Sequence, residues 1–328
     1  MAPSPARLTF FCELGAGPLE ALFAHPAVVE HLLALRASVS LGVLDLGPER
    51  AGVVRRLNEA GVPVVAWLLL PEAEGYWFHQ GNAPQATARY EAFRAWTAAQ
   101  GLRWDGVGLD IEPDIHDLRR ALESRWRMLP ALLPRLRRGG ALREARAGYG
   151  ALMARIREDG YRVDSYQLPF IVDERRAGST LLQRLSGVLD VPADREVLML
   201  YTSLVRPHGP GMLWSYGPDA RSVGVGVTGG GVDVPGLIDV PPLDWEELAR
   251  DLRLARRWTE DIHVFSLEGC VRQDFLARLR DFDWLGAVET PPPSARRVNW
   301  LRRAVGPVLR LGTERGAAGH ARQEQDEA

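Results

Sequence analysis

Two carboxylates lie one residue apart at the end of an apolar segment, at Asp110 and Glu112 within residues 104–114. Side chains alternate between the two faces of a β-strand, so the two acids share one face. Val107 and Leu109 share the other face. A structural strand has little reason to bury two neighbouring acids, because both charges must be solvated or paired; the alternative is that the two acids lie at an exposed strand end. A carboxylate beside Glu112 would raise its pKa and let it donate a proton near neutral pH. We therefore expect Glu112 to be a proton donor and Asp110 its partner.

The elements that must position these acids alternate between strand-like and helix-like segments along the chain. The predicted strands span residues 8–13, 39–45, 62–70, 104–114, 162–168, 196–201, 222–227 and 262–268. Eight strand–helix units in about 300 residues predict a single (β/α)8 TIM barrel over residues 1–311, and no glycine-rich phosphate-binding turn favours an open sheet. Residues 115–160 are expected to form an extended helical insertion after the fourth strand. Residues 312–328 are expected to be a polar, disordered tail.

Further polar residues stand at the predicted carboxyl ends of strands, where active sites of such barrels lie. They are Glu13, Asp45, Gln167, Tyr201 and Glu268. If Val264, Ser266 and Glu268 point inward, Glu268 could be a second catalytic carboxylate, opposite Glu112. We expect Tyr201 to be catalytic as well, and the first three to bind substrate.

Aromatic side chains follow the predicted third and sixth strands. Trp77 and Trp214 offer flat apolar faces on which sugar rings could stack. Packing of these rings onto the rim of the barrel is an equally good interpretation of each one. Both are expected substrate-binding residues.

The segment Asp105-Gly106-x-x-x-Asp110-x-Glu112 resembles the fourth-strand signature of family 18 glycoside hydrolases, the chitinases and endo-N-acetylglucosaminidases. The resemblance implies hydrolysis of a glycosidic bond with Glu112 as the acid/base. It implies that Asp110 orients the substrate's N-acetyl group and stabilises an oxazolinium-like intermediate, with the acetamide as nucleophile.

The chain departs from that family at three positions. Gly108 stands where the signature has its first inner aspartate, and Thr202 stands where the family has an aspartate after Met199 and Tyr201. Glu268 lies where the family usually has tryptophan. The motif therefore lacks one of the carboxylates of the family signature, at Gly108.

Composition limits the partners. The net charge of −2 at pH 7 gives no basic surface for nucleic acid. The sequence shows no signal peptide or transmembrane span, which predicts a cytoplasmic protein without membrane contact. Two cysteines leave no zinc-ligand spacing. We expect a carbohydrate or other small-molecule substrate and no cofactor or metal, with the oligomeric state open.

Two alternatives remain open. A metal-dependent isomerase, epimerase or phosphodiesterase could use acids at the strand ends, together with His116, as ligands for Mg²⁺ or Mn²⁺. A barrel that binds sugar without chemistry is the other, because Gly108 interrupts the catalytic motif.

Overall fold

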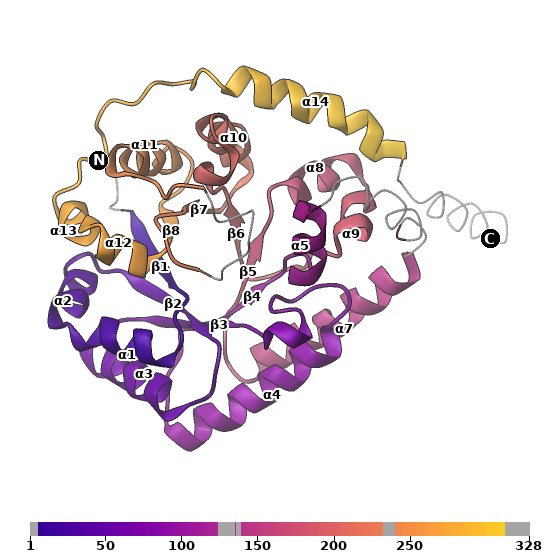
Figure 1. Cartoon of the computed structure of the whole chain (residues 1–328). Coiled ribbons are helices and arrows are strands. Elements are labelled where there is room, and N and C mark those ends of the chain that lie inside the picture. The colour runs from indigo at the N-terminus through magenta and orange to yellow at the C-terminus, as the bar shows by residue number, and fades with distance from the viewer. Residues whose placement is uncertain (1–5, 124–134, 136–138, 232–239, 312–328) are drawn as a thin grey trace, which may run out of the picture.

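A computed structural model describes residues 6–123, 135, 139–231 and 240–311 (Figure 1). Its parallel strands follow one another around a closed barrel in chain order, and β8 pairs with β1. The strands are β1 (Arg7–Cys12), β2 (Ser38–Val43), β3 (Val64–Leu68), β4 (Gly106–Asp110), β5 (Val163–Gln167), β6 (Arg195–Met199), β7 (Ser222–Gly226) and β8 (Asp261–Phe265). The predicted single (β/α)8 barrel is confirmed. The predicted tail, residues 312–328, lies outside the described residues.

Helices surround the barrel on the outside (Figure 1). The α-helices are α1 (Ala16–Ala24), α2 (Pro26–Ala34), α3 (Pro48–Ala60), α4 (Ala83–Gln100), α5 (Ile115–Glu123), α7 (Gly139–Glu158), α8 (Phe170–Ala177), α9 (Leu181–Ser186), α10 (Gly209–Tyr216), α11 (Trp245–Arg256), α12 (Leu267–Arg272), α13 (Phe275–Arg280) and α14 (Ala295–Leu311). Short 3-10 helices are η1 (Glu72–Glu74), η3 (Thr202–Val205) and η4 (Gly217–Asp219). Within the described ranges, no helix is both long and apolar enough to cross a membrane.

The interval after β4 is helical at both of its described ends. Helix α5 begins it, and α7, a helix of 20 residues, ends it and packs against α4 (Figure 1). Residues 124–134 and 136–138, in the middle of the predicted insertion, lie outside the described part of the chain.

The two faces of the strands supply two separate apolar clusters. Outward residues pack under the helices, whereas Phe11, Trp67 and Tyr166 point into the barrel and pack against one another. The Phe11 and Tyr166 rings meet edge to face with centroids 4.8 Å apart, and Phe11 meets Trp67 at 5.3 Å. Interlocked aromatic rings therefore fill the barrel interior below its carboxyl end.

Strand β4 alternates as the sequence predicts. Val107, Leu109 and Ile111 are fully buried in the outer cluster, and Asp110 faces the interior. Beyond β4, the loop after β3 continues the pairing: the Phe78 N–H donates to the Asp110 carbonyl at 2.9 Å. The Glu112 N–H donates in turn to the Phe78 carbonyl at 3.0 Å. Main-chain bonds thus fix Glu112 after the strand itself has ended.

The predicted eighth strand is wrong in its extent and in its faces. Strand β8 ends at Phe265, and Ser266 caps α12 by accepting a hydrogen bond from the Gly269 N–H at 3.1 Å. Glu268 therefore lies in the first turn of α12. Val264 belongs to the outer cluster, while Phe265 lines the interior. A serine that caps a helix ended the strand earlier than the apolar pattern suggested.

Candidate active site

A cavity of about 380 Å³ opens at the carboxyl end of the barrel. Three carboxyl groups line it, those of Glu13, Asp110 and Glu112. No arginine or histidine is among the described residues that line the cavity. The cavity is therefore acidic and has no cation among its described lining residues, which favours neutral or cationic ligands over anionic ones.

Asp110 is almost completely buried at the end of β4. Its Oδ2 accepts a hydrogen bond from Trp67 Nε1 at 3.1 Å, and its buried Oδ1 has no partner among the described residues. Burial, followed by the charges of Glu112 and Glu13, raises the pKa of Asp110 well above its usual range. A buried acid with an unused oxygen in a cavity is placed to bind a polar group of a ligand.

Glu112 lies one pleat beyond Asp110 and lines the same cavity. Burial raises the pKa of Glu112 to about 7. A carboxyl group with that pKa is about half protonated at neutral pH, and a group of this kind can both give and take a proton during a reaction cycle.

Glu13 follows β1 and is held by a residue of the loop after β3. Tyr76 Oη donates to Glu13 Oε1 at 2.6 Å. The Tyr76 backbone has a φ of 63°, a left-handed conformation that is uncommon outside glycine. The Tyr76 ring also meets Trp77 edge to face, with centroids 5.3 Å apart. Tyr76 thus orients Glu13, and the adjacent Trp77 lies in the cavity wall.

Tyr201 follows β6 and lines the cavity with Met199, so the predicted inward face of this strand is correct. Burial and then the charges of Asp110 and Glu112 raise the pKa of Tyr201 well above its usual range. Its phenol is therefore neutral and can donate a hydrogen bond to a ligand.

Glu268 does not line the cavity. Its Oε1 accepts a hydrogen bond from the Glu13 N–H at 3.3 Å, and burial raises the pKa of Glu268. From the first turn of α12 it thus positions the main chain of Glu13. Its predicted place opposite Glu112 depended on the incorrect end of the eighth strand.

The structure places three predicted substrate-binding residues away from the cavity. Asp45 pairs with Arg50, with 2.8 Å between Oδ2 and Nη2, and holds the turn after β2. Gln167 points away from the interior, and its Nε2 donates to the Leu189 carbonyl at 3.3 Å. Trp214 packs on Trp258, with ring centroids 5.1 Å apart. The predicted set therefore meets in the cavity through Glu13, Trp77, Asp110, Glu112 and Tyr201.

Trp67 and Tyr166 are not among the site residues that the sequence predicts, and the bond from Tyr76 to Glu13 is not predicted either. Trp67 carries the only polar group on an otherwise apolar strand, which was an available signal for a contact inside the barrel. Tyr76 is adjacent to Trp77, but nothing in the sequence indicated its bond to Glu13. Tyr166 stands beside the residue that was singled out, Gln167, on the opposite face of β5.

The described residues contain no group of three or more His, Cys, Asp or Glu side chains placed to hold a metal ion. His116, a ligand in the metal-dependent alternative, lies 3.0 Å from the Glu72 carbonyl through its Nε2. The metal-dependent alternative stays a prediction, and the described residues offer no set of metal ligands for it.

Comparison with known proteins adds evidence on the fold. No model of a protein family and no curated protein matches the chain. The glycoside hydrolase domain of PgaB (BpsB) from Bordetella bronchiseptica is similar in structure, with a TM-score of 0.50 and 12% identity over 87% of this chain and 100% of that one. A GH18 chitinase from Pseudoalteromonas aurantia has a TM-score of 0.49 and 12% identity over 84% and 98%.

A mutant tryptophan synthase α-subunit from Pyrococcus furiosus is similar too, with a TM-score of 0.41 and 15% identity over 84% of this chain and 96% of that one. Such low identities carry information on architecture but not on activity. The chain is a (β/α)8 barrel, and its fold is similar to that of the glycoside hydrolase domain of PgaB (BpsB).

Proposed function

We propose that this protein is a glycoside hydrolase in which Glu112 is the proton donor and Asp110 its partner. The observation that carries the proposal is the placement of both carboxyl groups in one aromatic-walled cavity, with the pKa of Glu112 raised to about 7. The barrel fold and the resemblance of the fourth-strand motif agree with it.

In the proposed reaction, Glu112 gives its proton to the glycosidic oxygen while the bond from that oxygen to C1 breaks. The alcohol leaves, and positive charge develops at C1 in the cavity that the carboxyl groups of Glu13 and Asp110 line. Water then adds to C1, and its proton returns to Glu112. If the sugar is N-acetylated, Asp110 offers its unpartnered Oδ1 to the acetamide, whose oxygen attacks C1 first, as the resemblance implies.

The acidic lining of the cavity restricts the classes of substrate that we expect. A phosphodiester or an acidic sugar would bring negative charge into a cavity lined by acids, with no cation among the described lining residues to balance that charge. Neutral or cationic sugars avoid that cost. We therefore place the phosphodiesterase alternative behind hydrolysis of a neutral or amino sugar, and we place the activity in the cytoplasm, as the sequence predicts.

The test begins with a panel of 4-methylumbelliferyl glycosides that identifies the sugar. Alkyl glycosides of that sugar then need protonation of the leaving oxygen, so Glu112→Gln should lower kcat by about a hundredfold or more. The exposed Glu20→Gln is the matched control and should keep wild-type turnover. Wild-type turnover in Glu112→Gln would overturn the assignment of the proton donor.

The kcat of Glu268→Gln, measured on the same substrates, distinguishes Asp110 from Glu268 as the catalytic partner of Glu112. A loss as large as that of Glu112→Gln would favour the pair Glu112 and Glu268 expected from the sequence. A smaller loss fits a residue that positions Glu13. Binding of the sugar without turnover in the wild-type protein would instead favour the non-catalytic alternative.

A further inference from the structure

Part of the cavity is built from apolar side chains and not from acids. They come from the loops after β5 and β6 and from α10, and we call them the apolar wall: Leu168, Pro169, Phe170, Leu204, Val205 and Met212. The three carboxyl groups come instead from β1 and β4. The acids, which we call the acidic part of the cavity, and the apolar wall are therefore supplied by different strands of the barrel.

The apolar wall leaves hydrophobic surface open to solvent. Leu204 is 40% exposed and Val205 is 39% exposed, and both are large side chains that line the cavity. Apolar surface that faces water in a cavity favours a ligand that covers it, because each buried methylene contributes about 0.8 kcal/mol, or roughly fourfold in affinity.

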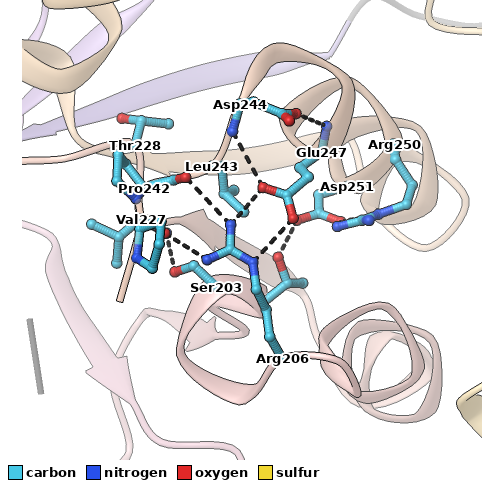
Figure 2. A network of polar contacts seen from close by, with 12 residues as sticks. Ser203, Arg206, Val227, Thr228, Pro242, Leu243, Asp244, Glu247, Arg250 and Asp251 are labelled. Carbon is cyan, nitrogen blue, oxygen red and sulfur yellow. Dashed lines mark hydrogen bonds and ion pairs between the residues drawn. The ribbon is translucent and has the colours of Figure 1, made fainter. Parts of the chain in front are cut away.

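The segment that carries these residues is held firmly in place (Figure 2). Arg206, next to Val205, donates from Nε to Glu247 Oε1 at 3.0 Å and from Nη2 to the Pro242 carbonyl at 3.3 Å. On the other side, Ser203 Oγ accepts from the Val227 N–H at 2.8 Å. Leu204 and Val205 thus lie in a segment that is held at both ends, and a ligand need not order that segment on binding.

The polar groups available on this side do not suit a second sugar. Among the described lining residues from the loops after β5 and β6, the hydroxyl groups of Ser203 and Tyr201 are the polar side chains, and Ser203 already accepts from a main-chain N–H. A sugar ring placed against the apolar wall would lose hydrogen bonds to water without replacing them, which costs free energy.

We infer that the apolar wall is the subsite for the leaving group, so that the substrates are glycosides with an alkyl or aryl aglycone and not oligosaccharides. This inference rests on the proposed function, since it takes the sugar to lie beside the acids. The acidic part then holds the sugar, and the alcohol released after protonation by Glu112 departs along the apolar wall.

The test uses n-alkyl glycosides of the sugar found in the panel, from methyl to hexyl. Their leaving alcohols have similar acidity, so a rise in kcat/KM along the series reports binding of the chain. We expect hexyl over methyl to exceed tenfold, and Leu204→Gln and Met212→Gln to lower that ratio at least threefold. Leu33→Gln, at an equally exposed leucine on α2 that does not line the cavity, should leave the ratio unchanged. Equal kcat/KM along the series in an active enzyme would overturn the inference and leave the hydrolase standing.

A binding measurement distinguishes failure of the proposed hydrolase function from failure of the proposed apolar subsite. If no glycoside is hydrolysed, the proposed function fails, and calorimetric titration with methyl and hexyl β-D-glucoside decides about the apolar wall. Tighter binding of the hexyl compound, weakened by Leu204→Gln but not by Leu33→Gln, would support it as an apolar ligand site. Equal affinity for the two compounds would reject it.

Discussion

The phenol of Tyr166 occupies the space that a side chain on Gly108 would need. A Cβ at Gly108 would lie 2.3 Å from Tyr166 Oη and 2.7 Å from its Cζ. The phenol cannot easily move, because Tyr166 Oη lies 2.6 Å from Ser40 Oγ and the ring packs against Phe11. The departure from the family 18 signature at Gly108 therefore has a steric reason in the neighbouring strand.

We expect Gly108→Ala to destabilise the fold by about 1–3 kcal/mol, since it overpacks a filled interior. Urea unfolding would measure this loss. Tyr166→Leu empties the space, so the double variant should lose less than the sum of the two single losses. Strict additivity would show that Tyr166 does not exclude a side chain at Gly108.

The hydrogen bond from Trp67 to Asp110 gives a second prediction. It lowers the pKa of Asp110 against the larger effects of burial and neighbouring charge. Trp67→Phe keeps a ring but removes the donor, so the pKa of Asp110 should rise further and kcat should fall about tenfold, with the pH profile displaced upward.

Trp104→Phe is the matched control for that experiment. It also removes a buried indole hydrogen bond, from Trp104 Nε1 to Thr97 Oγ1 at 3.1 Å, but outside the barrel interior. It should cost stability without displacing the pH profile. The same displacement in both variants would trace the effect to general loosening of the fold.

The sequence predicted the barrel and the acidic face of β4 because alternation of side chains is a local property. Val107 and Leu109 pack outside and Asp110 faces in, as two-residue periodicity requires. Alternation gives no such information for β3, which is buried throughout, so only the polar indole N–H of Trp67 could indicate that its side chain faces the interior.

Other failures came from contacts between segments. Glu268 was assigned to a strand because Ser266 was not recognised as a helix cap. Asp45 ends the predicted second strand, but it pairs with Arg50 of α3, a contact between segments that the sequence does not show. An acid at a strand end can serve either structure or chemistry, and the sequence does not show which partner it meets.

The raised pKa of Glu112 predicts a pH-dependent stability. Its folded-state pKa of about 7 lies above the usual value for an unfolded chain, so the stabilisation it gives is complete at acid pH and is lost as the pH rises through 7. Glu112→Gln cannot ionise and should be more stable than wild type at pH 8, by up to about 3 kcal/mol. At pH 4 the two should have similar Tm values. Glu20→Gln serves as the control, and an equal Tm difference at both pH values would contradict the raised pKa.

His263 predicts the opposite dependence. It is fully buried inside the barrel between Phe11 and Tyr166, with ring centroids 5.5 Å and 6.4 Å away, and burial lowers the pKa of His263 to about 3. In the unfolded chain this histidine binds a proton near pH 6.5, whereas in the folded chain it stays neutral. The free energy of unfolding therefore falls as the pH drops below 6.5. At pH 5 this loss is about 2 kcal/mol.

His263→Phe keeps an aromatic ring of similar size and removes that loss. Its Tm should rise relative to wild type at pH 5 by several degrees more than at pH 8, as followed by circular dichroism. The exposed His25→Gln should show no such difference between the two pH values. A gain that is equal at pH 5 and pH 8 would mean that improved packing, and not the excluded proton, explains the change.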